Sequence, residues 1–175
     1  MKQHEKGSTL LELIIALAIM VLVAGAAQAG IYQTAKTTES NAAHMTAVSQ
    51  VQNAGYWIAH DARMAQGVVT DNLTLPDFLL LSWIEQASCD DYKLTYTLEN
   101  MAESPLTKML RHQYINGVLS STTLVAQYID PDSGNTSCEY NSGILTLTIT
   151  ATVDRGSSTE IETRIYRIVP RPVNN

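Results

Sequence analysis

The chain has 175 residues and carries 11 Lys plus Arg against 17 Asp plus Glu, which gives a formal net charge of −6. This length predicts one or at most two small domains, and the acidic balance argues against a strongly basic nucleic-acid-binding protein. Charged residues make up only 16% of the chain, below the usual share of about a quarter. Neutral polar residues take their place, which suits an extracytoplasmic surface.

An apolar segment near the amino terminus is the strongest signal in the chain. From Ser8 to Ile31 the segment contains a single charged residue, Glu12. As a helix, residues 8–31 would be about 36 Å long, enough to cross a hydrocarbon core of about 30 Å. We therefore expect a transmembrane helix over residues 8–31.

Lysines on either side of this segment indicate its orientation. Lys2 and Lys6 precede it, and only Lys36 follows closely. The bias of positive charge toward the cytoplasm places the amino terminus inside and the bulk of the chain outside. The expected topology is a single pass through the cytoplasmic membrane followed by an extracytoplasmic domain.

Two ordinary interpretations of the segment must be considered. Residues 1–29 could be a conventional signal peptide, with Ala27-Gln28-Ala29 as a small-residue cleavage site. The chain would then be a secreted β-domain for ligand binding or catalysis. Alternatively, the segment is a plain membrane anchor in which Glu12 lies close enough to Lys6 to reach the headgroups.

A third interpretation uses more of the residues. The run Lys6-Gly7-Ser8-Thr9-Leu10-Leu11-Glu12, followed by apolar residues, resembles the processing site of type IV prepilins and pseudopilins. The resemblance implies that residues 1–7 are a leader, that prepilin peptidase cuts after Gly7, and that Ser8 becomes the N-methylated terminus. Ser8 departs from the phenylalanine usual in this family. Glu12 would occupy the fifth mature position, where its carboxylate pairs with the amino terminus of a neighbouring subunit during assembly.

The same resemblance implies a function and partners. The chain would be a structural subunit, similar to a minor pilin or a minor pseudopilin of type II secretion, in an envelope filament. Its partners would be other pilin or pseudopilin subunits, prepilin peptidase, the inner-membrane assembly platform and membrane lipid. The residues do not distinguish a pilus from a secretion pseudopilus or a DNA-uptake machine.

The helical pattern continues beyond the membrane segment, over residues 32–66. Apolar or small residues recur at spacings of three and four, which predicts one buried helix face. They are Met45, Val48, Val51, Gly55, Ile58, Ala62 and Ala65. Gly67 is placed to cap the carboxyl end of this helix.

Residues 67–175 are expected to form a β-rich globular domain. Apolar and polar residues alternate with the period of two that is typical of half-buried strands. The expected strands are 78–84, 92–99, 109–115, 118–129, 145–153 and 161–169. The predicted fold class is therefore α+β, pilin-like, with a long amino-terminal helix packed on a mostly antiparallel sheet.

Turn signals connect these strands. Asn116-Gly117 is the preferred dipeptide of a type I′ hairpin turn, and a second hairpin is expected at Asp154–Ser158. Residues 130–143 are expected to be a loop. Its start, Asp130 to Asn135, partly resembles a calcium loop, although a type I turn explains the same residues and Asn141 stands where an EF-hand needs an acid.

Catalytic groups are sparse. His44, His60 and His112 are isolated, and no Cys-x-x-Cys or His-x-x-x-His spacing suggests a metal. His60 and Asp61 are sequence neighbours, which do not normally face each other on a helix. We expect no enzyme activity, no catalytic residue, no metal and no cofactor.

Two cysteines, Cys89 and Cys138, both lie in polar stretches. Because the expected topology exports them, we expect them to form a disulfide. Acidic neighbours would raise the pKa of a free thiol at either position, which argues against a reactive cysteine.

Overall fold

The computed structural model describes residues 10–102, 104–156 and 158–171. The chain forms two compact units, Met1–Glu39 and Ser40–Asn175. Helix α1, Leu10–Met64, contributes residues to both units. Each unit is described by itself.

The described part of the first unit is helical throughout. Its large apolar side chains are exposed, among them Leu10, Leu13, Leu17 and Leu22. α1 is long and apolar enough to cross a membrane, judged by length and composition. A helix whose exposed side chains are apolar is typical of a segment that has lipid or the helices of other subunits as its neighbours.

The second unit packs the remaining part of α1, from residue 40 onward, against a sheet. Small and β-branched residues form the buried face of the helix, which lets the strands come close to its backbone. These residues are Ala43, Ala47, Val51, Ala54, Gly55, Ile58 and Ala62. The prediction that Met45 belongs to this face is wrong, because Met45 is 68% exposed. The buried face passes through Ala43 and Ala47 on the other side of the helix.

The strands follow the helix in one continuous series. In the part of the chain that the structure describes they form an eight-stranded sheet in which every pairing is antiparallel. They are β1 (Gly67–Val69), β2 (Asp77–Ile84), β3 (Asp91–Asn100), β4 (Thr107–Ile115), β5 (Val118–Ile129), β6 (Ser137–Asn141), β7 (Ile144–Arg155) and β8 (Ser158–Ile168). The α+β class is confirmed.

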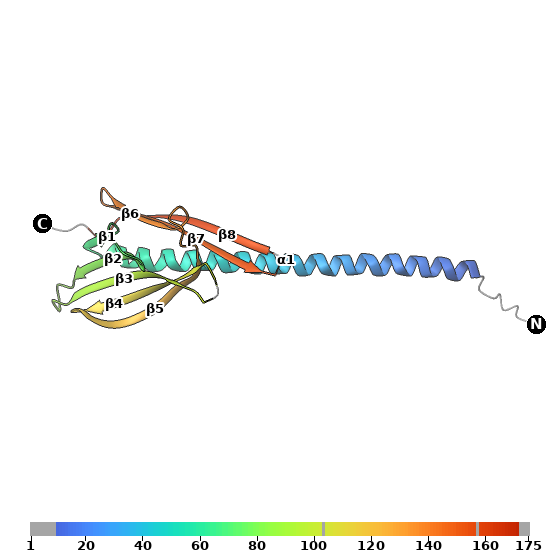
Figure 1. The fold of residues 1–175 in the computed structure, drawn as a ribbon, viewed down its shortest axis with the longest axis horizontal. Coiled ribbons are helices and arrows are strands. Elements are labelled where there is room, and N and C mark those ends of the chain that lie inside the picture. The colour runs from blue at the N-terminus through green and yellow to red at the C-terminus, as the bar shows by residue number, and fades with distance from the viewer. Residues whose placement is uncertain (1–9, 103, 157, 172–175) are drawn as a thin grey trace, which may run out of the picture. The chain divides into compact units, whose positions relative to one another are not determined.

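The order of the strands shows how the sheet surrounds the helix. It runs β1-β2-β3-β4-β5-β7-β6, and β8 pairs with the other edge of β7. Among the described residues, β5 and β7 are joined only where Ile129 faces Ala151. Figure 1 shows β2–β5 and β6–β8 as two groups of strands on either side of the carboxyl-terminal part of α1. The core lies between these strands and the helix, with Leu81, Leu94 and Ile149 fully buried.

One predicted turn is present in the fold, and one predicted helix cap is not. The hairpin at Asn116-Gly117 is confirmed, since both residues have the positive φ of a type I′ turn, 52° and 79°. Gly67 does not cap the helix. α1 ends at Met64, and Gly67 begins β1, where it pairs with Ser82.

The expected loop over residues 130–143 is also wrong in part, because Ser137–Asn141 form β6. This strand has no alternating apolar residues, and it exists because it pairs with β7. Ser142 and Gly143 have φ angles of 52° and 79°, so they form a second turn of the I′ kind. A serine-glycine pair ahead of the threonine-rich strand was the available signal.

Candidate functional site

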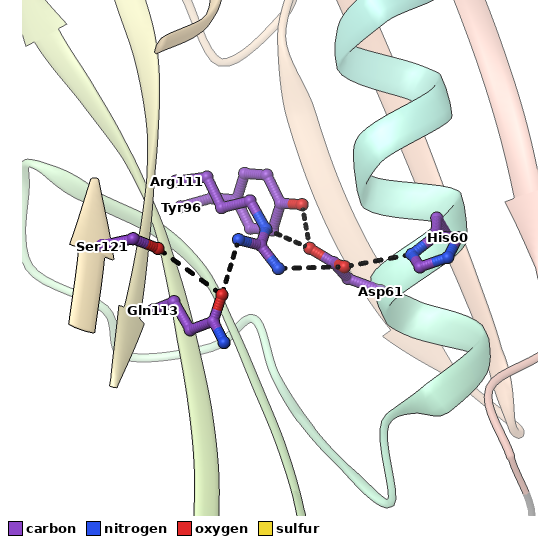
Figure 2. Close-up of polar contacts among 6 residues, drawn as sticks. All are labelled: His60, Asp61, Tyr96, Arg111, Gln113 and Ser121. Carbon is purple, nitrogen blue, oxygen red and sulfur yellow. Dashed lines mark hydrogen bonds and ion pairs between the residues drawn. The ribbon is translucent and has the colours of Figure 1, made fainter. Parts of the chain in front are cut away.

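A buried polar cluster lies where the last turns of α1 meet β3 and β4. Asp61 is only 2% exposed, although it lies on the helix face that is otherwise apolar. Its Oδ2 accepts hydrogen bonds from the Tyr96 hydroxyl and from Arg111 Nε, each at 2.6 Å. Arg111 Nη2 donates to Asp61 Oδ1 at 3.3 Å. Figure 2 shows the carboxylate between the helix and the two strands.

Neighbouring side chains complete the environment of Arg111. Its guanidinium lies over the Trp57 ring, 5.3 Å from the ring centroid. Nη1 donates to Gln113 Oε1 at 3.2 Å, and the Ser121 hydroxyl donates to the same oxygen at 3.5 Å. No buried side-chain polar atom of the described residues lacks a hydrogen-bond partner. The cluster is therefore satisfied, which is the condition for a buried ion pair to be tolerated.

The cluster shifts the pKa values of its members in ways that keep it intact. Burial and the negative charge of Asp61 raise the pKa of Tyr96 well above its usual value, so the phenol keeps its proton. Burial alone would lower the pKa of Arg111, but the hydrogen bonds and charge of Asp61 outweigh it and raise the pKa. Both donors to Asp61 thus stay protonated over the physiological range.

His60 contacts the same carboxylate, contrary to the expectation from its position. His60 Nδ1 lies 3.3 Å from Asp61 Oδ1, with the imidazole 57% exposed and the carboxylate buried. Asp61 Oδ1 is thus shared between His60 and Arg111 Nη2, whereas Oδ2 accepts the two shorter bonds. Asp61 therefore connects α1 to the two strands and also contacts His60 on its own helix.

The two cysteines do not form the expected disulfide. Both are free thiols, Cys89 exposed and Cys138 partly buried. Cys89 lies in the turn between β2 and β3, whereas Cys138 lies on β6, and the strand order places β4, β5 and β7 between these elements. Burial, and then the charge of Glu139, raises the pKa of Cys138 to about 12. The expectation that Cys138 is a poor nucleophile agrees with this shift.

The acidic loop after β5 uses its carboxylates internally. Asp130 Oδ1 accepts from the Asp132 amide at 3.0 Å, and Asp132 Oδ1 accepts from the Gly134 amide at 2.8 Å. Asn135 Nδ2 donates to Asp130 Oδ2 at 2.9 Å. No group of three His, Cys, Asp or Glu side chains that could hold a metal occurs within the described ranges.

The sequence predicts three functional residues near the amino terminus, Gly7, Ser8 and Glu12. Gly7 and Ser8 lie outside the described residues. Glu12 lies in the first turn of α1, exposed and surrounded by the exposed Leu10, Leu11 and Leu13. Nothing in the described part of the chain covers this carboxylate. A lone acid on an apolar helix surface needs a charged or hydrogen-bonding partner when lipid or protein surrounds it.

A family model for the prokaryotic N-terminal methylation motif matches residues 2–28. The chain has a type IV prepilin-like amino terminus. No curated protein and no solved structure matches the chain. The prepilin-like motif indicates a substrate of prepilin peptidase that assembles with pilin-type subunits, and the long apolar helix agrees with membrane anchoring.

The buried cluster of this prepilin-like chain is the part that the sequence did not reveal. The sequence shows Asp61 beside His60 but does not link it to Tyr96 or Arg111, which lie on predicted strands. A signal was present, because Asp61 lies beside the predicted apolar face, three residues after Ile58 and four before Ala65. An acid at such a position requires a buried cation or donor from the facing strands.

Proposed function

We propose that this chain is a structural subunit, of the minor kind, in a type IV pilus-like or type II secretion filament. The observation that carries the proposal is the methylation motif over residues 2–28. The exposed apolar surface of α1 supports it, because such a surface is suited to lipid before assembly and to other helices afterwards. The role is one of assembly rather than of catalysis.

The proposal assigns insertion, processing and assembly to successive segments of the chain. The chain inserts with its amino terminus in the cytoplasm, and prepilin peptidase cuts between Gly7 and Ser8 and methylates Ser8. The unit that begins at Ser40 lies outside the cytoplasm. The assembly platform in the inner membrane then transfers the subunit from lipid into the filament, where Glu12 pairs with the terminus of a neighbour.

The mature amino terminus tests the proposal. Mass spectrometry of the protein from the cell envelope should find Ser8 as the first residue, heavier by one methyl group, with the apolar segment retained. A Gly7→Leu variant should keep residues 1–7, because the proposed cut lies directly after this glycine. A terminus at Gly30, after Ala27-Gln28-Ala29, would contradict the proposal and make the chain an ordinary secreted domain.

A further inference from the structure

The inner face of the sheet extends beyond the end of α1. Leu81 and Leu94 are fully buried. Trp83 and Tyr92 lie on the same face, two residues further along β2 and β3, where α1 has already ended at Met64. Their rings are stacked, 5.2 Å apart with parallel planes. A cleft of about 460 Å³ opens at this place.

The cleft gathers positive charge in an otherwise acidic chain. Three of the six arginines of the sequence, Arg63, Arg111 and Arg171, line it. Asp61 already neutralises Arg111. Neither Arg63 nor Arg171 forms an ion pair with another described residue. The acids that line the cleft are Asp61 and Glu85, so an excess of positive charge is left for a ligand.

Amide groups add hydrogen-bonding capacity beside these charges. Gln86 and Gln113 both line the cleft. Figure 2 shows the amide oxygen of Gln113 bonded to Arg111 and Ser121, with its nitrogen directed away from both. Side-chain amides of this kind donate to the carbonyls of an extended peptide, whereas Trp83 and Tyr92 offer a surface for a ring.

We propose that this cleft binds an acidic, ring-bearing peptide segment of a neighbouring filament subunit. One or two carboxylates pair with Arg63 and Arg171, an aromatic side chain packs on Trp83, and the peptide backbone bonds to the glutamine amides. The volume lies within the range of about 300–1,000 Å³ that suits a drug-sized ligand or a few residues. Arginine and tryptophan are also the residues that most often dominate binding energy at protein interfaces. The inference rests on the proposed function only for the source of the peptide.

A peptide titration tests the chemistry of the cleft. The full chain in detergent micelles is titrated with a blocked, fluorescently labelled pentapeptide, Gly-Phe-Glu-Glu-Gly, and anisotropy reports binding. We expect saturable binding that weakens as salt is added. Replacing both glutamates of the peptide by glutamine, or its phenylalanine by alanine, should each weaken binding about tenfold or more.

Matched variants of the chain locate the binding. Arg63→Glu combined with Arg171→Glu should weaken binding about tenfold or more, because two attractive pairs become repulsive. Arg155 is also exposed, at the end of β7, but does not line the cleft, so Arg155→Glu should change binding less than about twofold. Equal binding by the two kinds of variant, or no binding of the acidic peptide, would overturn the inference. Binding of a glucuronate disaccharide without binding of the peptide would also overturn the inference, because the ligand would then be an acidic carbohydrate.

Photo-cross-linking in the cell envelope tests whether the bound peptide comes from a neighbouring subunit. With a photoreactive residue at Gln86, the adduct should map to an acidic segment of another subunit that carries a methylation motif, and it should disappear in the double arginine variant. An adduct with a protein outside the filament, or none, would overturn the partner assignment. The terminus at Ser8 is measured independently, so failure here would leave the proposed filament role intact.

Discussion

At the scale of single residues, Asp61 shows how one charge positions a whole helix. A carboxylate that is 2% exposed needs compensation, and it finds Arg111 and Tyr96 on adjacent strands. A rotation of α1 would carry the carboxylate away from both donors and leave buried charges unpaired. The pair thus selects one orientation of the helix, even if an apolar replacement would be equally stable.

Removing the Asp61 carboxylate should therefore lower the stability of the fold. Asp61→Ala leaves the guanidinium of Arg111 buried without its anion, and we expect the free energy of unfolding to fall by about 3–5 kcal/mol. Urea denaturation of the full chain in micelles, followed by the fluorescence of Trp57 and Trp83, measures the loss. Asp61→Ala with Arg111→Met should lose less than the sum of the two single changes.

An exposed ion pair on the same sheet gives the control. Lys108 and Glu99 lie 3.1 Å apart with side chains 36% and 38% exposed. Glu99→Ala should change stability by about 0–1 kcal/mol. An equal effect of Asp61→Ala and Glu99→Ala would show that the buried pair does not hold the helix in place.

At the scale of elements, the sequence predicted what depends on periodicity and missed what depends on pairing. The alternation from Leu145 to Val153 identified β7, because one face of that strand is buried and the other is not. β6 and the three-residue β1 carry no such pattern, since they add to an existing edge through backbone hydrogen bonds. The Asp61 cluster was missed for a similar reason, because its partners are 35 and 50 positions away in the chain.

The contact between α1 and β8 depends on a residue without a side chain. A Cβ at Gly55 would lie 2.1 Å from the Tyr166 ring. The hydroxyl of Tyr166 donates to the Val51 carbonyl at 3.0 Å, which restricts movement of the ring. Helix and strand can approach closely only because Gly55 leaves this space.

Gly55→Ala should accordingly destabilise the second unit. Overpacking costs about 1–3 kcal/mol, which exceeds the gain of up to about 1 kcal/mol from the better helix propensity of alanine. The fall in the urea midpoint of the full chain measures the net effect, and Tyr166→Leu in the same chain should relieve part of it.

Gly30 provides a matched position on the same helix. A Cβ at Gly30 has no atom within 4 Å, so Gly30→Ala should leave the urea midpoint unchanged or raise it. If Gly55→Ala proved as harmless as Gly30→Ala, the close approach of α1 and β8 would not be a requirement of the fold.

At the scale of the whole molecule, the proposed filament role makes Glu12 an assembly residue rather than a folding residue. Glu12→Ala should leave cleavage at Ser8 and folding of the second unit intact while blocking entry into filaments. Each contact between subunits would lose one partner of a desolvated ion pair, which costs about 3–5 kcal/mol of stability. The loss would recur at every such contact of an open-ended assembly. Shearing of filaments and membrane fractionation measure the two outcomes.

Glu39→Ala is the control for Glu12→Ala. Glu39 is also an exposed acid on α1, but it lies beyond the apolar segment. Its replacement should leave incorporation unchanged. Normal incorporation of Glu12→Ala would contradict charge pairing as the basis of assembly.

The contacts along the carboxyl-terminal part of α1 also determine how the second unit would respond to a pulling force. Ser40 bonds to Glu160, Val51 to Tyr166 and Asp61 to Arg111, so the attachments are spread along the helix. Tension along the helix axis would load them together, in shear, rather than open them one after another as in peeling. A subunit that is drawn out of a membrane by its first helix would in this way transmit the pull to its folded unit without unravelling it.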